Sequence, residues 1–234
     1  MHVRRRQDHS IKNLFKRTIS AQLHAIGSVL MIGGAAYLLP IASQFGPQHF
    51  WACFWFIFTG TLVFTLSAVY HFLGDGYELS PRLEAALENL DHFGIYLFIA
   101  GTYTPFIMSA LSPPWRIPLL ITIWTVAVVG ITYTWSKPLL PKILQHRMVY
   151  TSIFMLMGWT IIVRIHDVYT NLNRWEMFFL VAGGVAYSVG AVVYATRRPR
   201  LMEGFFGFHE LWHVMVLLGA GFHYFLILSF YSIP

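Results

Sequence analysis

The chain has 234 residues, of which 56% are hydrophobic, 17% aromatic and only 11% charged. Soluble domains carry about 25% charged residues, so a soluble fold of this length would expose too much apolar surface. The composition therefore indicates a protein that has lipid as its solvent. The net charge of +6 does not point to a nucleic-acid partner, because the basic residues lie in short segments between apolar runs. The single cysteine, Cys53, excludes an internal disulfide.

Seven apolar segments are long enough to cross a membrane, which takes about 20 residues of helix. The first follows a basic N-terminus, but it exceeds the roughly 7–15 apolar residues of a cleaved signal peptide, so we expect an uncleaved span. Short connections rich in Gly, Pro and Asn, among them an expected turn at Gly74-Asp75-Gly76, predict one all-α domain over 19–234, a seven-transmembrane helix bundle, after a basic segment 1–18. The expected spans are 19–42, 49–72, 86–111, 116–136, 147–167, 175–196 and 207–231.

Lysine and arginine are distributed unequally between the two ends of these spans. Thirteen of the 16 fall on the side of the N-terminus, which predicts a cytoplasmic N-terminus and, with an odd number of spans, a C-terminus outside. We therefore expect a multi-pass protein of the cell inner (plasma) membrane. The thirteen are Arg4, Arg5, Arg6, Lys12, Lys16, Arg17, Arg82, Lys137, Lys142, Arg147, Arg197, Arg198 and Arg200, and the other three are Arg116, Arg164 and Arg174.

Ionisable residues inside spans are costly, so each one needs a reason. Four of them, His71, Asp91, His209 and His213, lie within about two or three helical turns of the same predicted face. His209 and His213 are four residues apart, so both imidazoles project from one side of one helix. Three histidines and a water form the open, catalytic type of zinc site, whereas structural sites close with four protein ligands. The sequence therefore predicts Zn²⁺ bound by His71, His209 and His213.

Two further residues are predicted to act in catalysis beside the metal, Asp91 and Ser67. Asp91 could accept a hydrogen bond from a metal-bound water and take its proton, since a metal lowers the pKa of that water to about 7. Ser67 lies one turn before His71, where its hydroxyl could orient the water or a substrate carbonyl; alternatively, it bonds the carbonyl four residues earlier. Glu210 is a rival base, because His209-Glu210-Leu211-Trp212-His213 matches the H-E-x-x-H motif of metallopeptidases.

Three stretches of the chain resemble the hemolysin III family, which belongs with the progestin and adipoQ receptors, including the adiponectin receptors. The resemblance implies a seven-helix fold with a cytoplasmic N-terminus, zinc held by His71, His209 and His213, and Asp91 on the zinc water. It looks bacterial rather than animal. The stretches are Ser67-Ala-Val-Tyr-His71, Leu90-Asp91-His92 with Ile95-Tyr96-Leu97-Phe98-Ile99-Ala100-Gly101-Thr102-Tyr103-Thr104-Pro105-Phe106, and Phe208-His209-Glu210-Leu211-Trp212-His213.

The first motif of that family is altered here. The family has a Glu, a short gap, an Asn, three residues and a His before the first span. In this chain no Glu precedes, Ser20 stands in the place of the Asn, and His24 keeps the His. His24 could contact the metal ligands from the side away from the metal. We favour a packing role for it at the membrane interface. For His92, which projects about 100° away from Asp91, we expect packing or a polar contact rather than ligation.

The function predicted from these residues is a zinc-dependent membrane hydrolase of a lipid amide or ester, with a membrane lipid as its substrate. The wider superfamily implied by the resemblance includes alkaline ceramidases. One alternative is a receptor or sensor in which zinc is structural. The other is a hemolysin or pore, as the family name suggests. Charged residues argue against the pore, because they gather at one face and do not line a path across the membrane.

Overall fold

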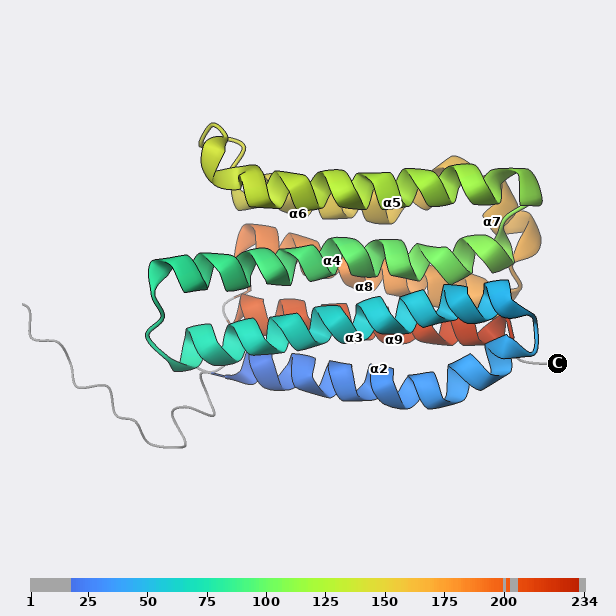
Figure 1. Ribbon diagram of the computed structural model, residues 1–234, viewed down its shortest axis with the longest axis horizontal. Helices are drawn as coiled ribbons and strands as arrows, with labels where there is room; N and C mark the ends of the chain where they lie inside the picture. Colours follow the sequence, from blue (N-terminus) through green and yellow to red (C-terminus); the bar gives the residue numbers. More distant parts are fainter. Residues whose placement is uncertain (1–17, 200, 203–205, 232–234) are drawn as a thin grey trace, which may run out of the picture.

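The computed structural model describes residues 18–199, 201–202 and 206–231 (Figure 1). Seven of its helices are long and apolar enough to cross a membrane, as the sequence predicts. Within the described ranges there is no strand, only one isolated bridge between Met202 and Phe206. The protein is therefore an all-α, multi-pass membrane protein. Except for Thr18, the basic segment predicted at 1–18 lies outside the described residues.

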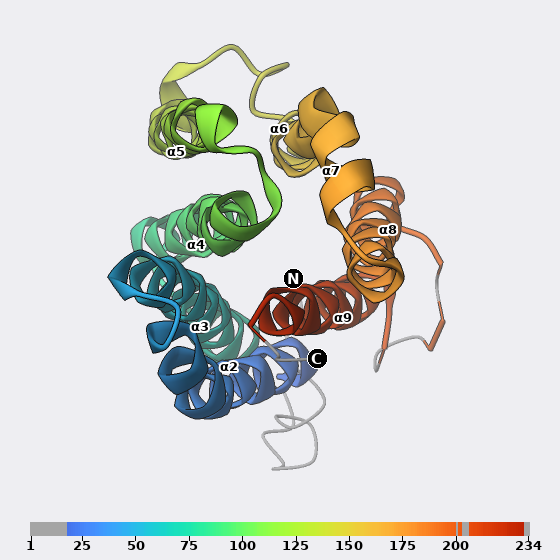
Figure 2. The ribbon, with the colours of Figure 1, turned by 90° about the vertical axis from the view of Figure 1, so that its right-hand side faces the viewer.

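The spans form a bundle in which successive helices run in opposite directions (Figure 1). Viewed along the bundle, α2 lies beside α3 and α9, while α5 and α6 lie on the far side of the ring (Figure 2). The elements are α2 (Ile19–Ser43), α3 (Pro47–Gly76), α4 (Pro81–Ala110), α5 (Pro113–Ser136), η1 (Lys137–Leu139), α6 (Arg147–Gly158), η2 (Trp159–Arg164), α7 (Ile165–Asn171), α8 (Arg174–Thr196) and α9 (Phe208–Ser229).

Several helices begin at residues that favour a helix N-terminus. A proline opens α3, α4 and α5, where its missing N–H would have had no partner in any case. Ser80 caps α4, because its hydroxyl accepts a hydrogen bond from the Leu83 amide. At the start of α8, Asn173 and Glu176 form a reciprocal capping box.

The end of α3 differs from the prediction. We expected Gly74-Asp75-Gly76 to form a turn, but the helix continues through Gly76, and the Tyr77 amide still donates to the Leu73 carbonyl at 3.0 Å. Two glycines weaken a helix without forbidding it, since each costs about 1 kcal/mol relative to alanine. The extra turn places Asp75 one helical turn beyond His71.

The fifth span is not one regular helix. It consists of α6, the 3₁₀ segment η2 and α7, and irregular backbone in lipid needs partners for its freed polar groups. The Tyr103 hydroxyl of α4 provides them, because it donates to the Gly158 carbonyl at 2.6 Å and accepts from the Ile161 amide at 3.0 Å. This accounts for a buried tyrosine at that depth in α4.

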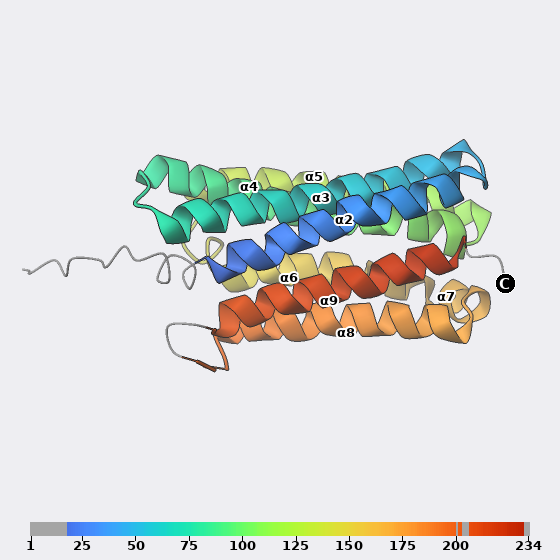
Figure 3. The same cartoon turned by 90° about the horizontal axis from the view of Figure 1, so that it is seen from below.

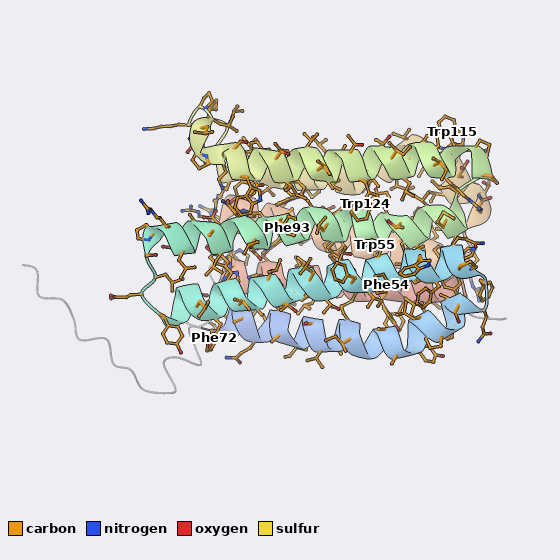
Figure 4. All side chains as sticks on the ribbon, viewed as in Figure 1. Phe54, Trp55, Phe72, Phe93, Trp115 and Trp124 are labelled. Carbon is orange, nitrogen blue, oxygen red and sulfur yellow. The ribbon has the colours of Figure 1, made fainter. Side chains whose placement is uncertain are left out.

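The outer surface of the bundle carries apolar and aromatic side chains, as lipid requires (Figure 4). Trp55 of α3 and Trp124 of α5 meet there edge to face, with ring centroids 5.9 Å apart. Trp51, Trp115 and Trp175 lie near the starts of three spans and are 55%, 45% and 58% exposed. Tryptophan is enriched at membrane–water interfaces, and this placement agrees with that preference.

The interior is filled by two apolar clusters that share α4. One gathers side chains from α4, α5 and α6, including Tyr96, Ile123 and Phe154. The other joins α2, α3 and α9, and includes Phe64 and Phe98. Because Tyr96 and Phe98 project to opposite sides of α4, this helix links the two halves of the bundle.

The two ends of the bundle differ in charge. The end where α2 begins also holds the α3–α4, α5–α6 and α8–α9 connections (Figures 1 and 3). We call it the basic end, because six of the nine described Lys and Arg residues lie there: Arg82, Lys137, Lys142, Arg147, Arg197 and Arg198. Arg116, Arg164 and Arg174 lie at the opposite end. The fold thus separates these residues as the predicted topology does.

Gly94 offers a test of the close approach between α3 and α4. A Cβ at Gly94 would lie 2.9 Å from the Cα of Val63, so an added methyl group must push backbone apart. We expect Gly94→Ala to destabilise the protein by about 1–3 kcal/mol, seen as a lower unfolding temperature in detergent. Gly184→Ala is the matched control, because no atom lies within 4 Å of its Cβ position and alanine favours the helix. Equal effects of the two substitutions would contradict the close contact.

Candidate metal centre

Three histidines from two helices meet at the basic end of the bundle. His71 lies near the end of α3, and His209 and His213 lie in the first two turns of α9. The Nε2 atoms of His71 and His209 are 3.3 Å apart, and those of His209 and His213 are 3.0 Å apart. His71 and His213 are buried and His209 is half-buried. The structure therefore brings together the three residues that the sequence predicts as ligands.

The geometry of this histidine cluster suits a metal ion. One ligand nitrogen from each residue lies within 4.8 Å of the others. A tetrahedral zinc site, with Zn–N bonds of about 2.0–2.1 Å, separates its nitrogens by about 3.3 Å. The two nitrogen–nitrogen distances given above are close to this value. The cluster could hold a metal ion with three protein nitrogens, which leaves a fourth position for another ligand.

The outer nitrogen of His71 faces a carboxylate. Its Nδ1 lies 3.3 Å from Oδ2 of Asp75, one turn further along α3. A neutral imidazole that donates Nδ1–H keeps its lone pair on Nε2, the atom that faces the cluster. Ligating histidines commonly donate their second ring nitrogen to a carboxylate in this way. Asp75 is 43% exposed, so this contact lies at the rim of the site.

The outer nitrogen of His213 faces a fourth histidine. Nδ1 of His213 lies 2.8 Å from Nε2 of His24 on α2, and both rings are buried. Our preference for a packing role of His24 is therefore wrong, because this side chain makes a direct polar contact to a predicted ligand. Ser20, one turn earlier, lies on the same side of α2, and its hydroxyl donates to Oε1 of Glu210 at 3.4 Å. The altered first motif thus contacts α9 at two points.

Glu210, the rival base, has a structural role at the start of α9. Its Oε2 accepts the Gly207 amide at 2.7 Å, which caps the helix, and its Oε1 accepts the Ser20 hydroxyl. Both carboxylate oxygens are therefore engaged away from the histidine cluster. The H-E-x-x-H spacing here combines two cluster histidines with a capping glutamate.

A cavity of about 80 Å³ lies against the histidine cluster. Asp91 lines it from α4, as predicted, and so does Glu88, one turn earlier on the same helix. Glu88 pairs with Lys137 at 3.3 Å, which balances one of the two negative charges. The lining residues are Tyr70, His71, Glu88, Asp91, His92, Ile95, Phe154, Tyr194, His209, Trp212 and His213.

Ser67 and His92 have different surroundings. Ser67 is buried one turn from His71, and its hydroxyl has no hydrogen-bond partner among the described residues; it does not line the cavity. The bond to its own helix that we considered is therefore not formed. His92 stacks against Tyr150, with ring centroids 4.6 Å apart, and is not one of the three clustered histidines. This agrees with the packing role expected for it.

Some residues of the site were missed by sequence reasoning. Asp75 could have been found, because it follows His71 by four residues, but the flanking glycines indicated a turn. Tyr194 and Trp212 line the cavity from α8 and α9, and Tyr194 shares a hydrogen bond with Tyr150 at 3.1 Å. Aromatic residues are abundant in most of the spans, so nothing in the sequence singles out these two.

Comparison with known proteins identifies the family and several relatives of this chain. The family model described as "Haemolysin-III related" matches residues 12–224. "Hemolysin-3" of Bacillus cereus is 35% identical over 218 residues, which cover 92% of this chain and 91% of the relative. The "Hemolysin-3 homolog" of Bacillus subtilis is 28% identical over 90% of this chain and 92% of that protein. The "Adiponectin receptor protein" of Drosophila melanogaster is 26% identical over 92% of this chain and 50% of its own length.

Metal content tests the cluster directly. We expect the purified protein to carry about one equivalent of zinc, and His71→Ala, His209→Ala or His213→Ala to lose most of it, since each removes one of three protein ligands. Elemental analysis of the detergent-purified variants measures this. His223→Ala is the matched control, because His223 is half-buried and lies ten residues beyond His213 along α9, about 15 Å away by helical rise. Zinc that stays in all three ligand variants would contradict the site.

Proposed function

Since this chain belongs to the haemolysin-III-related family, we propose that it is a zinc-dependent membrane hydrolase acting on a lipid amide or ester. The observation that carries this proposal is the convergence of three imidazole nitrogens beside a cavity that also contains a carboxylate. A purely structural zinc site closes with four protein ligands. Three ligands and an adjoining cavity are what a catalytic site needs.

The chemistry divides between the metal and the protein. Zinc held by His71, His209 and His213 would supply a water that is nucleophilic near neutral pH and would polarise a carbonyl. Asp91 would act as the base that accepts a proton from the attacking water, because its carboxylate lines the same cavity. The carbonyl carbon gains the water oxygen, the C–N or C–O bond breaks, and the proton passes to the leaving amine or alcohol. We assign no contact with the carbonyl to the Ser67 hydroxyl, because this side chain does not line the cavity.

The substrate class follows from the position and lining of the cavity. We place the basic end at the cytoplasmic face, because positively charged connections favour that side. The lining combines the polar groups with Ile95, Phe154 and Trp212, which suit an apolar neighbour of the scissile bond. A cavity of about 80 Å³ has room for the reacting group and a few waters. The acyl chains of a lipid substrate would extend from it towards the bilayer.

The name of the Bacillus cereus relative, "Hemolysin-3", favours a second candidate function, that of a hemolysin. A pore needs a polar path across the membrane. The ionisable side chains of the described spans lie mostly towards the two ends, and the half-buried His223 is an exception. Leakage of a dye from liposomes that persists after His209→Ala would favour the pore, whereas no leakage at all would favour the hydrolase.

Turnover is the first test of the proposal. We expect the zinc-loaded protein in detergent or nanodiscs to release fatty acid from ceramide-like amides or from ester lipids. His209→Ala should abolish this release, because it removes a metal ligand, while His223→Ala should retain it. Mass spectrometry of the released fatty acid measures both. A zinc-containing protein that hydrolyses neither class of lipid would contradict the proposal and favour a sensor with structural zinc.

The identity of the base is tested by two substitutions that each remove one negative charge. We expect Asp91→Asn to retain zinc but to lower turnover by about 10²–10⁴-fold, the usual contribution of a general base. Glu210→Gln should keep most activity, because an amide oxygen can still accept the Gly207 amide and cap α9. Zinc content and thermal stability, measured alongside, separate a lost base from a lost fold. The opposite pattern, with Glu210→Gln inactive, would revive the metallopeptidase-like assignment.

A further inference from the structure

Helices α2 and α9 run in the same direction and meet along a seam of four matched contacts (Figure 3). Towards the middle and the far end the seam is tight. A Cβ at Gly27 would lie 2.6 Å from Leu217, and one at Gly34 would lie 2.6 Å from the Tyr224 ring. The Tyr224 hydroxyl also donates to the Gly34 carbonyl at 2.9 Å. These contacts fix the register of the two helices.

The same register brings polar pairs together at the basic end of the seam. Ser20 meets Glu210, and one turn deeper His24 meets His213. The two residues on α2 are four apart and the two on α9 are three apart, so each pair lies on one face of its helix. Each residue on α2 therefore faces its partner on α9 across the seam. Glu210 also caps α9, so the Ser20 contact ties α2 to the turn that carries the first cluster histidine of that helix.

His24 is placed to act on His213 and not on a metal. Its Nε2 is 2.8 Å from Nδ1 of His213, on the far side of that ring from the atom that faces His209. Its own Nδ1 has no hydrogen-bond partner in the part of the chain that the structure describes. The ring packs edge to face on Phe64, with centroids 5.2 Å apart. A buried imidazole held in this apolar setting calls for a functional reason.

We propose that His24 is a positioning residue of the metal centre, which accepts the Nδ1–H of His213 and so keeps the Nε2 lone pair of His213 directed at the ion. The inference rests on the metal-binding part of the proposed function. It assigns a role to the altered first motif: His24 sets the tautomer and ring orientation of one ligand, and Ser20 holds the adjoining turn through Glu210. Partners of this kind typically change metal affinity by about 10–100-fold when they are removed.

Three substitutions of His24 separate the hydrogen bond from simple packing. In His24→Gln the side-chain amide reaches about as far as Nε2, so its oxygen can still accept from His213. In His24→Asn the amide ends near the position of Nδ1 and falls short. In His24→Leu the volume is largely kept without any acceptor. We expect His24→Gln to bind zinc close to the wild-type affinity, and the Asn and Leu variants to bind about 10–100-fold more weakly.

The measurement is zinc affinity of the full chain in detergent, by competition with a chromophoric chelator, together with the absorption spectrum of the Co²⁺-loaded protein. We expect the Co²⁺ spectrum to change in the Asn and Leu variants and to return in the Gln variant. His223→Leu changes a half-buried histidine on α9 far from the cluster, so it is the control and should alter neither quantity. A loss caused only by weaker packing would leave the Gln and Asn variants alike.

Each outcome is informative. Equal affinities for the Gln and Asn variants, or wild-type affinity in the Leu variant, would overturn the positioning role while leaving the metal site intact. If the Leu variant does not fold, the comparison of the Gln and Asn variants still tests whether the hydrogen bond positions His213. A wild-type chain that binds neither Zn²⁺ nor Co²⁺ would overturn this inference and the proposed function together. Failure of the positioning role alone is thus distinguished from failure of the metal site.

Discussion

Inside a helix bundle that is surrounded by lipid, the lone pair of an imidazole nitrogen needs a hydrogen-bond donor or a cation as its partner. Three such nitrogens converge here, and the outer ring nitrogens of His71 and His213 are directed at acceptors, the carboxylate of Asp75 and the Nε2 of His24. The Nε2 lone pairs of both histidines then face the same atom, Nε2 of His209. A single hydrogen on that atom cannot satisfy both neighbours at once, whereas a cation between the three nitrogens satisfies all of them.

The packing of the helices brings these nitrogens together. The ligands come from α3 and α9, and α2 lies against both helices. Glycines on α2 allow the close approach to α9 that puts His24 within hydrogen-bond distance of His213. By contrast, the irregular backbone of the fifth span is satisfied by Tyr103 from α4, away from the cluster. The side of the bundle formed by α2, α3 and α9 thus consists of regular helix where the ligands lie, which suits a site whose nitrogens must be held to a few tenths of an ångström.

The sequence was sufficient for the number of spans and for the three clustered histidines, because both follow from local rules. Apolar length defines a span, helical spacing pairs His209 with His213, and the depth in the span adds His71. The errors lie where the outcome depends on tertiary context. The two glycines that flank Asp75 predict a turn, although α3 continues through them to Gly76. His24 was assigned to packing because its partner is 189 residues away, and no single-helix pattern reveals which faces of α2 and α9 meet.

Glu210 illustrates why a motif needs its surroundings before it carries chemistry. The spacing of His209, Glu210 and His213 is that of a metallopeptidase helix, yet in this chain the glutamate lies in the first turn of α9, where four backbone amides lack helical partners. A carboxylate there is stabilised by capping and by the helix dipole, and it also accepts from Ser20. In the proposed hydrolase the proton acceptor is therefore a residue from another helix. Asp91 on α4 lines the cavity, so the proposed reaction would require α4 as well as the two helices that carry the clustered histidines.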